Sequence, residues 1–244
     1  MHQQEDQPQG KRQSPIHIFS SSTTTSEELK PLDFSKGWTE PMSGSFDNLG
    51  YTVTFRPKLP LATILKTHVG DYSFENFHYH WGEGAGCGSE HFVDGRQYEL
   101  EIHFVFKKMN NTKPDAGDAL AVIGIFGQVN SSAEMRGIWQ QVTPTQVLPS
   151  GSVQEVDGII YSELLPKARD YFYYEGSLTT PGYDEVVQWF VLKEPIQVPA
   201  LYLEQLRSIQ NTKGNKIVRN YRELQDLNGR VVKRLDLPTE ARSS

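Results

Sequence analysis

Three histidines, His78, His80 and His103, are the residues in this sequence best suited to chemistry. One residue separates His78 from His80, and alternate side chains of a β-strand point to the same face, so both imidazoles would project together from a strand. A neighbouring strand that carries His103 would add a third imidazole to that face. Three neutral imidazoles with an open fourth position are typical of a catalytic zinc site. The alternative is that strand histidines only satisfy hydrogen bonds within the core.

The rest of the chain must supply the strands that position these histidines. The length of 244 residues, with 37% hydrophobic content and glycines and prolines scattered between short apolar runs, is compatible with one all-β domain over 1–244. The run LAVIGIF at 120–126 is almost wholly apolar, which favours a central strand covered on both faces. Strand-like runs lie at 51–55, 72–81, 99–106, 120–129, 171–174 and 185–192, and short helices are expected at 133–140 and 199–209. Residues 1–12 are expected to form a mobile arm.

Composition narrows the class of protein. The net charge is −6 and the basic residues are dispersed, so we expect no nucleic-acid partner. No apolar run approaches the roughly 18 to 20 residues of a membrane span, and the polar N-terminus lacks the apolar core of a signal peptide. The only cysteine, Cys87, cannot form an internal disulfide, which favours a reducing compartment, and we expect the cytoplasm. The sequons at Asn110 and Asn130 would matter only in the secretory pathway.

The motifs around the histidines resemble the alpha-class carbonic anhydrases. The matching segments are QSPIHI (13–18), FHYHWG (77–82), SEH to ELEIHFV (89–105), LAVIGIF (120–126), LLP (164–166), GSLTTPG to LKEPI (176–196) and, more weakly, NYRELQDLNGR (220–230). The resemblance implies a mainly β domain with one central, twisted, mostly antiparallel sheet of about ten strands and short peripheral helices. It also implies reversible hydration of carbon dioxide to bicarbonate and a proton by zinc-bound hydroxide.

Roles for individual residues follow from the same resemblance. His78, His80 and His103 fall on the three Zn²⁺ ligands, and Asn76 and Glu101 fall where the family orients ligands, Asn76 standing in place of the usual glutamine. Metal-bound histidines usually donate their other N–H to such a partner.

The resemblance also implies a positioning pair and a substrate wall. Thr179 matches a threonine whose hydroxyl is held by a carboxylate, here Glu90, so that it aims the nucleophile. The apolar wall for carbon dioxide would contain Val105, Val122, Leu178 and Trp189, with Thr180 on the polar side. His91 would be structural. Carbon dioxide and bicarbonate, sulfonamides and small anions are the expected partners of a monomeric enzyme.

The chain departs from the family pattern at several positions. Tyr51 stands where fast members place a proton-carrying histidine, and a phenol with a pKa near 10 is poorly matched to that task compared with an imidazole near 6.5. We therefore expect slow turnover. Glu75, Gly182, Tyr183 and Glu223 also replace usual residues. The competing hypothesis is a related binding module without turnover, but such relatives typically lose a ligand histidine and this chain keeps all three.

Overall fold

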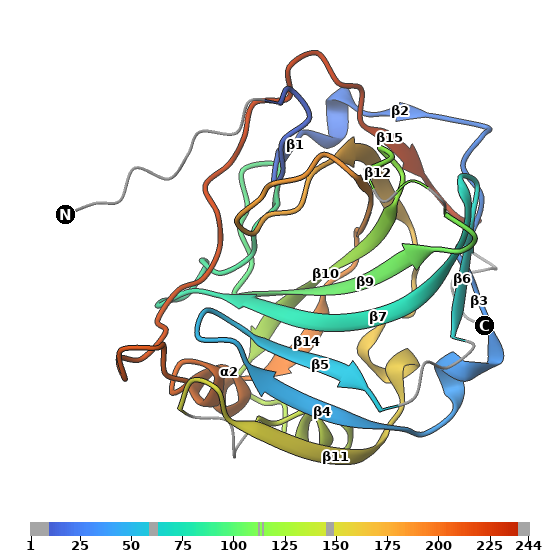
Figure 1. Ribbon diagram of the computed structural model, residues 1–244. Helices are drawn as coiled ribbons and strands as arrows, with labels where there is room; N and C mark the ends of the chain where they lie inside the picture. Colours follow the sequence, from blue (N-terminus) through green and yellow to red (C-terminus); the bar gives the residue numbers. More distant parts are fainter. Residues whose placement is uncertain (1–9, 59–62, 112, 114, 145–148, 239–244) are drawn as a thin grey trace.

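One large twisted sheet dominates the fold (Figure 1). The computed structural model describes residues 10–58, 63–111, 113, 115–144 and 149–238. Strands follow one another across the sheet in the order β11-β4-β5-β7-β9-β10-β13-β12-β15-β2, with β14 beside β10, β6 beside β7 and β3 beside β6. Neighbours are antiparallel except that β10 runs parallel to β13 and β14, and β15 parallel to β2. The predicted mostly antiparallel sheet is confirmed.

The elements have the following bounds within the described residues. The main sheet contains β2 (Thr24–Thr25), β3 (Asp33–Phe34), β4 (Met42–Asn48), β5 (Val53–Pro57), β6 (Ile64–Thr67), β7 (Gly70–Trp81), β9 (Leu100–Lys108), β10 (Leu120–Asn130), β11 (Val153–Ile159), β12 (Tyr171–Gly176), β13 (Val187–Leu192), β14 (Ile196–Pro199) and β15 (Lys233–Leu235). A separate parallel pair joins β1 (His17–Ile18) to β8 (Phe92–Val93). The α-helices are α1 (Ile138–Gln141) and α2 (Ala200–Leu206), and 3₁₀ turns lie at Ser20–Ser22, Lys36–Thr39 and Tyr161–Leu164.

The predicted elements need three corrections. The strand expected from residue 51 begins at Val53, because Gly50 adopts a positive φ of 84° and its N–H donates to the Asn48 side chain, which closes a turn instead. The helix expected at 133–140 shrinks to α1, which begins only after Gly137 with φ of 59°. The helix expected at 199–209 is shorter than predicted, because α2 begins at Ala200 and ends at Leu206. The sequence does not predict β4, β6, β11 and β14, nor the two- and three-residue strands β1, β2, β3, β8 and β15.

Two cores lie on opposite faces of the sheet, and β10 contributes to both. Ala121, Ile123 and Ile125 enter the larger core with many aromatic side chains, whereas Val122 and Phe126 enter the second core. This alternation confirms that the LAVIGIF strand is covered on both faces. His103 lies opposite Gly124 in the register, and its parity with Val105 places it on the face of the second core.

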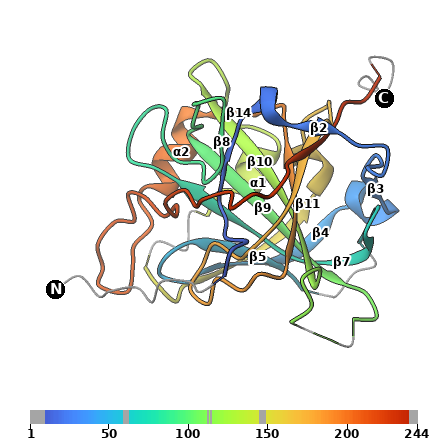
Figure 2. The ribbon, with the colours of Figure 1, turned by 90° about the horizontal axis from the view of Figure 1, so that it is seen from above.

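The C-terminal segment crosses the molecule without forming regular structure between 218 and 228 (Figures 1 and 2). Asn220 donates its backbone N–H to Trp81 at the end of β7 (3.1 Å), and Gln225 donates to Pro15 (2.8 Å). These bonds hold the 220–225 segment against Pro15 of the N-terminal segment and against the end of the histidine strand.

The arm predicted over 1–12 lies mostly outside the described residues, which begin at Gly10. At its described end, Arg12 donates to Glu175 (2.8 Å) and its backbone N–H to Glu185 (2.6 Å). Thr112 of the Asn110 sequon also lies outside the described part. Among the helices that the structure describes, none is long and apolar enough to cross a membrane.

Candidate metal centre and active-site cleft

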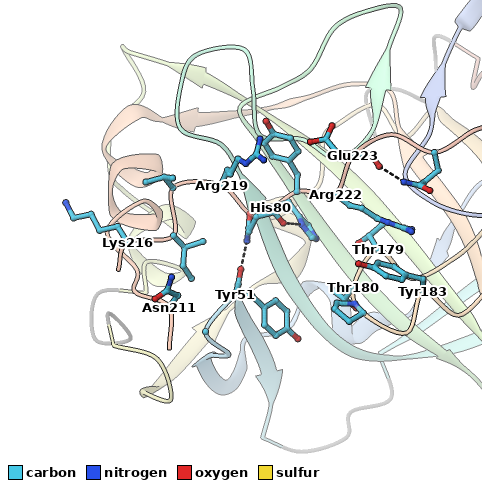
Figure 3. Close-up of a pocket in the computed structure, with 17 residues that line it drawn as sticks. Tyr51, His80, Thr179, Thr180, Tyr183, Asn211, Lys216, Arg219, Arg222 and Glu223 are labelled. Carbon is cyan, nitrogen blue, oxygen red and sulfur yellow. Dashed lines mark hydrogen bonds between the residues drawn. The ribbon is translucent and has the colours of Figure 1, made fainter. Parts of the chain in front are cut away.

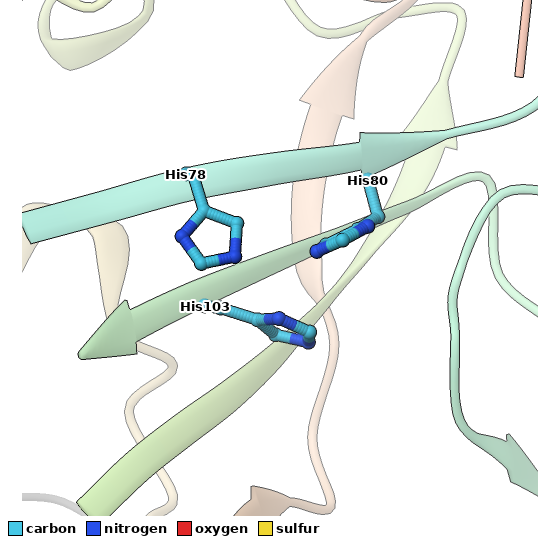
Figure 4. A group of neighbouring side chains, drawn as sticks. All are labelled: His78, His80 and His103. Carbon is cyan, nitrogen blue, oxygen red and sulfur yellow. The ribbon is translucent and has the colours of Figure 1, made fainter. Parts of the chain in front are cut away.

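The structure brings His78, His80 and His103 together (Figure 4). His78 and His80 project from β7, and His103 lies directly opposite His78 on β9. The ring centroids are 5.1 Å apart for His78 and His80, 5.2 Å for His78 and His103, and 4.4 Å for His80 and His103. One nitrogen of each ring lies within 4.8 Å of the others.

Each imidazole is oriented by a hydrogen bond from its other nitrogen. Nδ1 of His78 lies 3.2 Å from Oδ1 of Asn76, Nδ1 of His80 lies 3.0 Å from the backbone carbonyl of Asn220, and Nε2 of His103 lies 2.8 Å from Oε1 of Glu101. This pattern leaves Nε2 of His78, Nε2 of His80 and Nδ1 of His103 to bind one metal ion together. Nε2 of His80 is buried and has no hydrogen-bond partner among the described residues. An orphaned buried nitrogen within a set of three imidazoles fits a zinc ion.

Burial keeps two of these imidazoles neutral. It lowers the pKa of His78 well below its usual value, and repulsion from His80 and His103 adds to the effect. Burial also lowers the pKa of His80, although the nearby Glu90 carboxylate opposes this shift. Neutral imidazole is the form that binds a metal, so the protonation states suit a metal centre at neutral pH.

Glu101 is fully buried beneath the histidines and accepts four hydrogen bonds. Oε1 accepts from His103 and from Nδ1 of His91 (2.7 Å), and Oε2 accepts from the backbone N–H groups of Glu90 (2.8 Å) and His91 (2.9 Å). Burial opposes ionisation, but the charges and hydrogen bonds of His91 and His103 hold the pKa of Glu101 well below its usual range. His91 also lies 2.7 Å from the Tyr174 hydroxyl, as expected for a structural residue.

Glu90 and Thr179 both lie beside the metal centre. Glu90 is 1% exposed, and its Oε1 accepts from the backbone N–H of Arg222 (2.9 Å) and lies 3.2 Å from Nδ1 of His80. Oε2 of Glu90 has no hydrogen-bond partner in the part of the chain described. Thr179 lines the same cavity as His80. No hydrogen bond joins Thr179 to Glu90 among the described residues, so their coupling stays a prediction.

Two adjoining cavities form the cleft above the histidines. The larger, about 920 Å³, is lined by His80, Thr179, Tyr183 and Arg222 among others (Figure 3). The smaller, about 470 Å³, reaches His78. Tyr51 and Thr180 line both cavities and therefore mark their boundary. Tyr51 is 51% exposed, so this residue at the boundary is in contact with solvent.

The predicted apolar wall is divided by depth. Val105 and Leu178 line the smaller cavity, where Glu75 also stands. Val122 and Trp189 are 2% and 1% exposed and line neither cavity, so their place in the wall stays a prediction. They lie behind it: Val122 is paired with Val105 and Trp189, and the Trp189 ring meets His103 edge-on at 4.8 Å.

Asn220 is the site residue that sequence reasoning missed. Besides holding His80 through its carbonyl, it accepts from the Trp81 N–H (2.7 Å) and donates to the carbonyls of Tyr79 (2.9 Å) and Tyr51 (3.0 Å). Its place at the start of the weakly matching 220–230 segment was the only signal in the sequence, because a backbone carbonyl contact is not encoded by residue type.

Comparison with known proteins agrees with this geometry. The family model of the eukaryotic-type carbonic anhydrases matches residues 2–235. The chain belongs to this family. It is 35% identical over 238 residues to carbonic anhydrase 7 of Homo sapiens, covering 92% of this chain and 89% of the relative. Carbonic anhydrase 7 of Mus musculus is 34% identical and carbonic anhydrase 3 of Bos taurus 31% identical, each with the same 92% and 89% coverage. The predicted resemblance is confirmed, and with it carbonic anhydrase as the class of enzyme.

Proposed function

We propose that this carbonic anhydrase hydrates carbon dioxide reversibly to bicarbonate and a proton with Zn²⁺ held by His78, His80 and His103. The observation that carries the proposal is the set of three converging imidazole nitrogens, each on a ring whose other nitrogen is occupied by Asn76, Asn220 or Glu101. Zinc bound there would act as a Lewis acid and lower the pKa of a water molecule towards neutrality, an effect already known for the carbonic anhydrases as a class.

The remaining cleft residues bind and orient the reactants. Val105 and Leu178 give carbon dioxide an apolar surface beside the histidines, and Val122 and Trp189 support that surface from behind. Thr179 accepts a hydrogen bond from the attacking group and directs its own hydroxyl proton towards Glu90, which lies buried next to His80. Such positioning lowers the barrier because the reacting atoms are already aligned.

Proton export is the slow part of the proposed cycle. Tyr51 occupies the rim between the two cavities, where a proton carrier would stand. A phenol is a weak proton acceptor near pH 7, so regeneration of the site limits turnover at high substrate concentration.

The binding-module alternative is less well supported. All three histidines are retained, and burial and mutual repulsion keep His78 and His80 in the metal-binding form. We further propose a reducing, cytoplasmic setting, since Cys87 is the only cysteine, and a monomeric state.

The decisive experiment measures zinc content and stopped-flow carbon dioxide hydration on the same purified sample. We expect one zinc per chain and hydration above the uncatalysed rate, and expect His80→Ala to lose both. His68→Ala is the matched control, because His68 lies in the turn between β6 and β7 and lines neither cleft cavity. A zinc-loaded native sample without hydration, or a His80→Ala variant with native zinc affinity, would refute the proposal.

A further inference from the structure

We propose that the stacked pair Tyr183 and Arg222 positions Thr179 and Glu90 relative to the histidines, and thereby sets the rate of attack on carbon dioxide; this inference rests on the proposed function. The Arg222 guanidinium carbon lies 3.7 Å from the centroid of the Tyr183 ring. A guanidinium over an aromatic face is held both by attraction to the ring and by stacking. Figure 3 shows the pair on the wall of the larger cavity, next to Thr179 and Thr180.

Tyr183 belongs to the loop that carries Thr179. Its backbone N–H donates to Thr180 (3.0 Å), which closes a tight turn with Gly182 at a φ of 108°, and the Leu178 N–H donates to Asp184 (3.0 Å). Tyr183 itself has a φ of 48°. A bulky aromatic residue in this left-handed region is uncommon and strained, and glycine would fit the backbone better. The ring must therefore contribute something that a glycine does not.

Arg222 connects the stack to the metal centre. Its backbone N–H donates to Oε1 of Glu90, and Asn220, two residues earlier, holds His80. The guanidinium donates to the carbonyl of Ser14 (2.6 Å) and to Oε1 of Gln13 (2.9 Å). A shift of this side chain would move the backbone that fixes Glu90.

Gln13 links three segments: its own N-terminal segment, the Thr179 loop and the 220–222 segment. It is 4% exposed, and its amide donates to the Tyr183 carbonyl (3.1 Å) while its oxygen accepts from Arg222. The Thr179 loop and the 220–222 segment are thus fastened to one another and to the N-terminal segment. Without the stack, hydrogen bonds such as those of Gln13 would still join the two segments that flank the reacting groups, but the side-chain contact between them would be lost. Small misplacements of positioned groups slow reactions strongly.

Tyr183→Gly tests the stack with little confounding from backbone strain. Glycine satisfies the positive φ, so we expect the variant to fold and to bind one zinc per chain. We expect kcat/KM to fall about 10-fold, whereas kcat falls less, because proton export limits it. Tyr183→Phe keeps the ring and restores kcat/KM. Asn110→Gly, at an exposed loop position with φ of 55°, is the control for the backbone change and keeps native kinetics.

Arg222→Lys probes the other half of the pair, since it keeps the backbone N–H and the charge but loses the planar stack. We expect a similar fall in kcat/KM, and the double variant Tyr183→Gly with Arg222→Lys should fall no further than the worse single variant. A Tyr183→Gly enzyme within twofold of native kcat/KM, or single effects that multiply in the double variant, would overturn the inference. Failure of the proposed function is a separate outcome, because it shows in the native zinc-loaded enzyme as absent hydration.

Discussion

Gly124 and Glu101 lie so close across β10 and β9 that a Cβ atom at Gly124 would stand 2.9 Å from Oε1 of Glu101. That oxygen accepts the hydrogen bonds of His91 and His103, and Gly124 is paired with His103 in the register. The absence of a side chain at Gly124 thus makes room for the carboxylate that orients a metal ligand.

Gly124→Ala should push this carboxylate out of place. We expect the free energy of unfolding to fall by about 1–3 kcal/mol, a typical cost of overpacking, and zinc affinity to fall by roughly 10- to 100-fold, as when a ligand's orienting partner is lost. Gly127→Ala is the control on the same strand, because its Cβ would meet Leu100 and Val198 rather than Glu101. It should lower stability without changing the zinc dissociation constant. Equal zinc affinities in the two variants would contradict this role of Gly124.

Thr179→Ala should slow hydration with the metal retained. Thr179 lines the cavity next to His80 but contributes no metal ligand, so we expect one zinc per chain and a kcat/KM lower by roughly 10²-fold, comparable to the loss of one preorganised hydrogen bond. Zinc analysis and stopped-flow kinetics check the two halves of this prediction. A native kcat/KM would remove Thr179 from the mechanism.

Tyr51→His should raise kcat and leave kcat/KM nearly unchanged. The side chain at this position is half exposed at the boundary of the two cavities, and imidazole exchanges protons near pH 7 whereas a phenol does not. Added imidazole buffer should likewise raise kcat of the native enzyme. If neither change affects kcat, another group carries the proton.

The metal-free protein should lose stability as the pH falls. The pKa values of His78 and His80 are lowered in the folded state from 6.5, so below about pH 6.5 the unfolded chain takes up protons that the folded chain does not. The free energy of unfolding, measured with urea in the presence of a chelator, should decrease from pH 7 to pH 5. His80→Gln should make this dependence shallower; an equal slope in the variant would show that His80 is not its source.

Aromatic sulfonamides should inhibit hydration. A sulfonamide anion would occupy the open position between the three imidazoles, which faces cavities of about 920 and 470 Å³. Inhibition constants from stopped-flow hydration test this. If millimolar sulfonamide has no effect on an active zinc-loaded sample, Glu75 and Tyr183, which line the smaller and larger cavities, are the first residues to replace.

The sequence alone determined the residue types and local spacing of the site. The two-residue period of a strand places His78 with His80 and Glu101 with His103 on one face, and the apolar LAVIGIF run indicates a strand covered on both sides. The motifs were also specific enough to indicate the family. The predicted runs match long strands well where apolar residues alternate with others, as in β7, or follow one another, as in β10.

Only the tertiary structure decided which distant groups complete the site. The register of β7 against β9 puts His103 opposite His78, and no local pattern contains that pairing. The carbonyl of Asn220 and the N–H of Arg222 serve His80 and Glu90 through backbone atoms, which every residue type possesses. Val105 reaches the smaller cavity, whereas Trp189 is buried behind it. The sequence does not contain this difference, because the depth of a residue in a packed sheet depends on what covers each face. The sequence determines the chemistry of each side chain. Long-range pairing, and the burial that shifts the pKa of groups such as His78, arise only when the chain has folded.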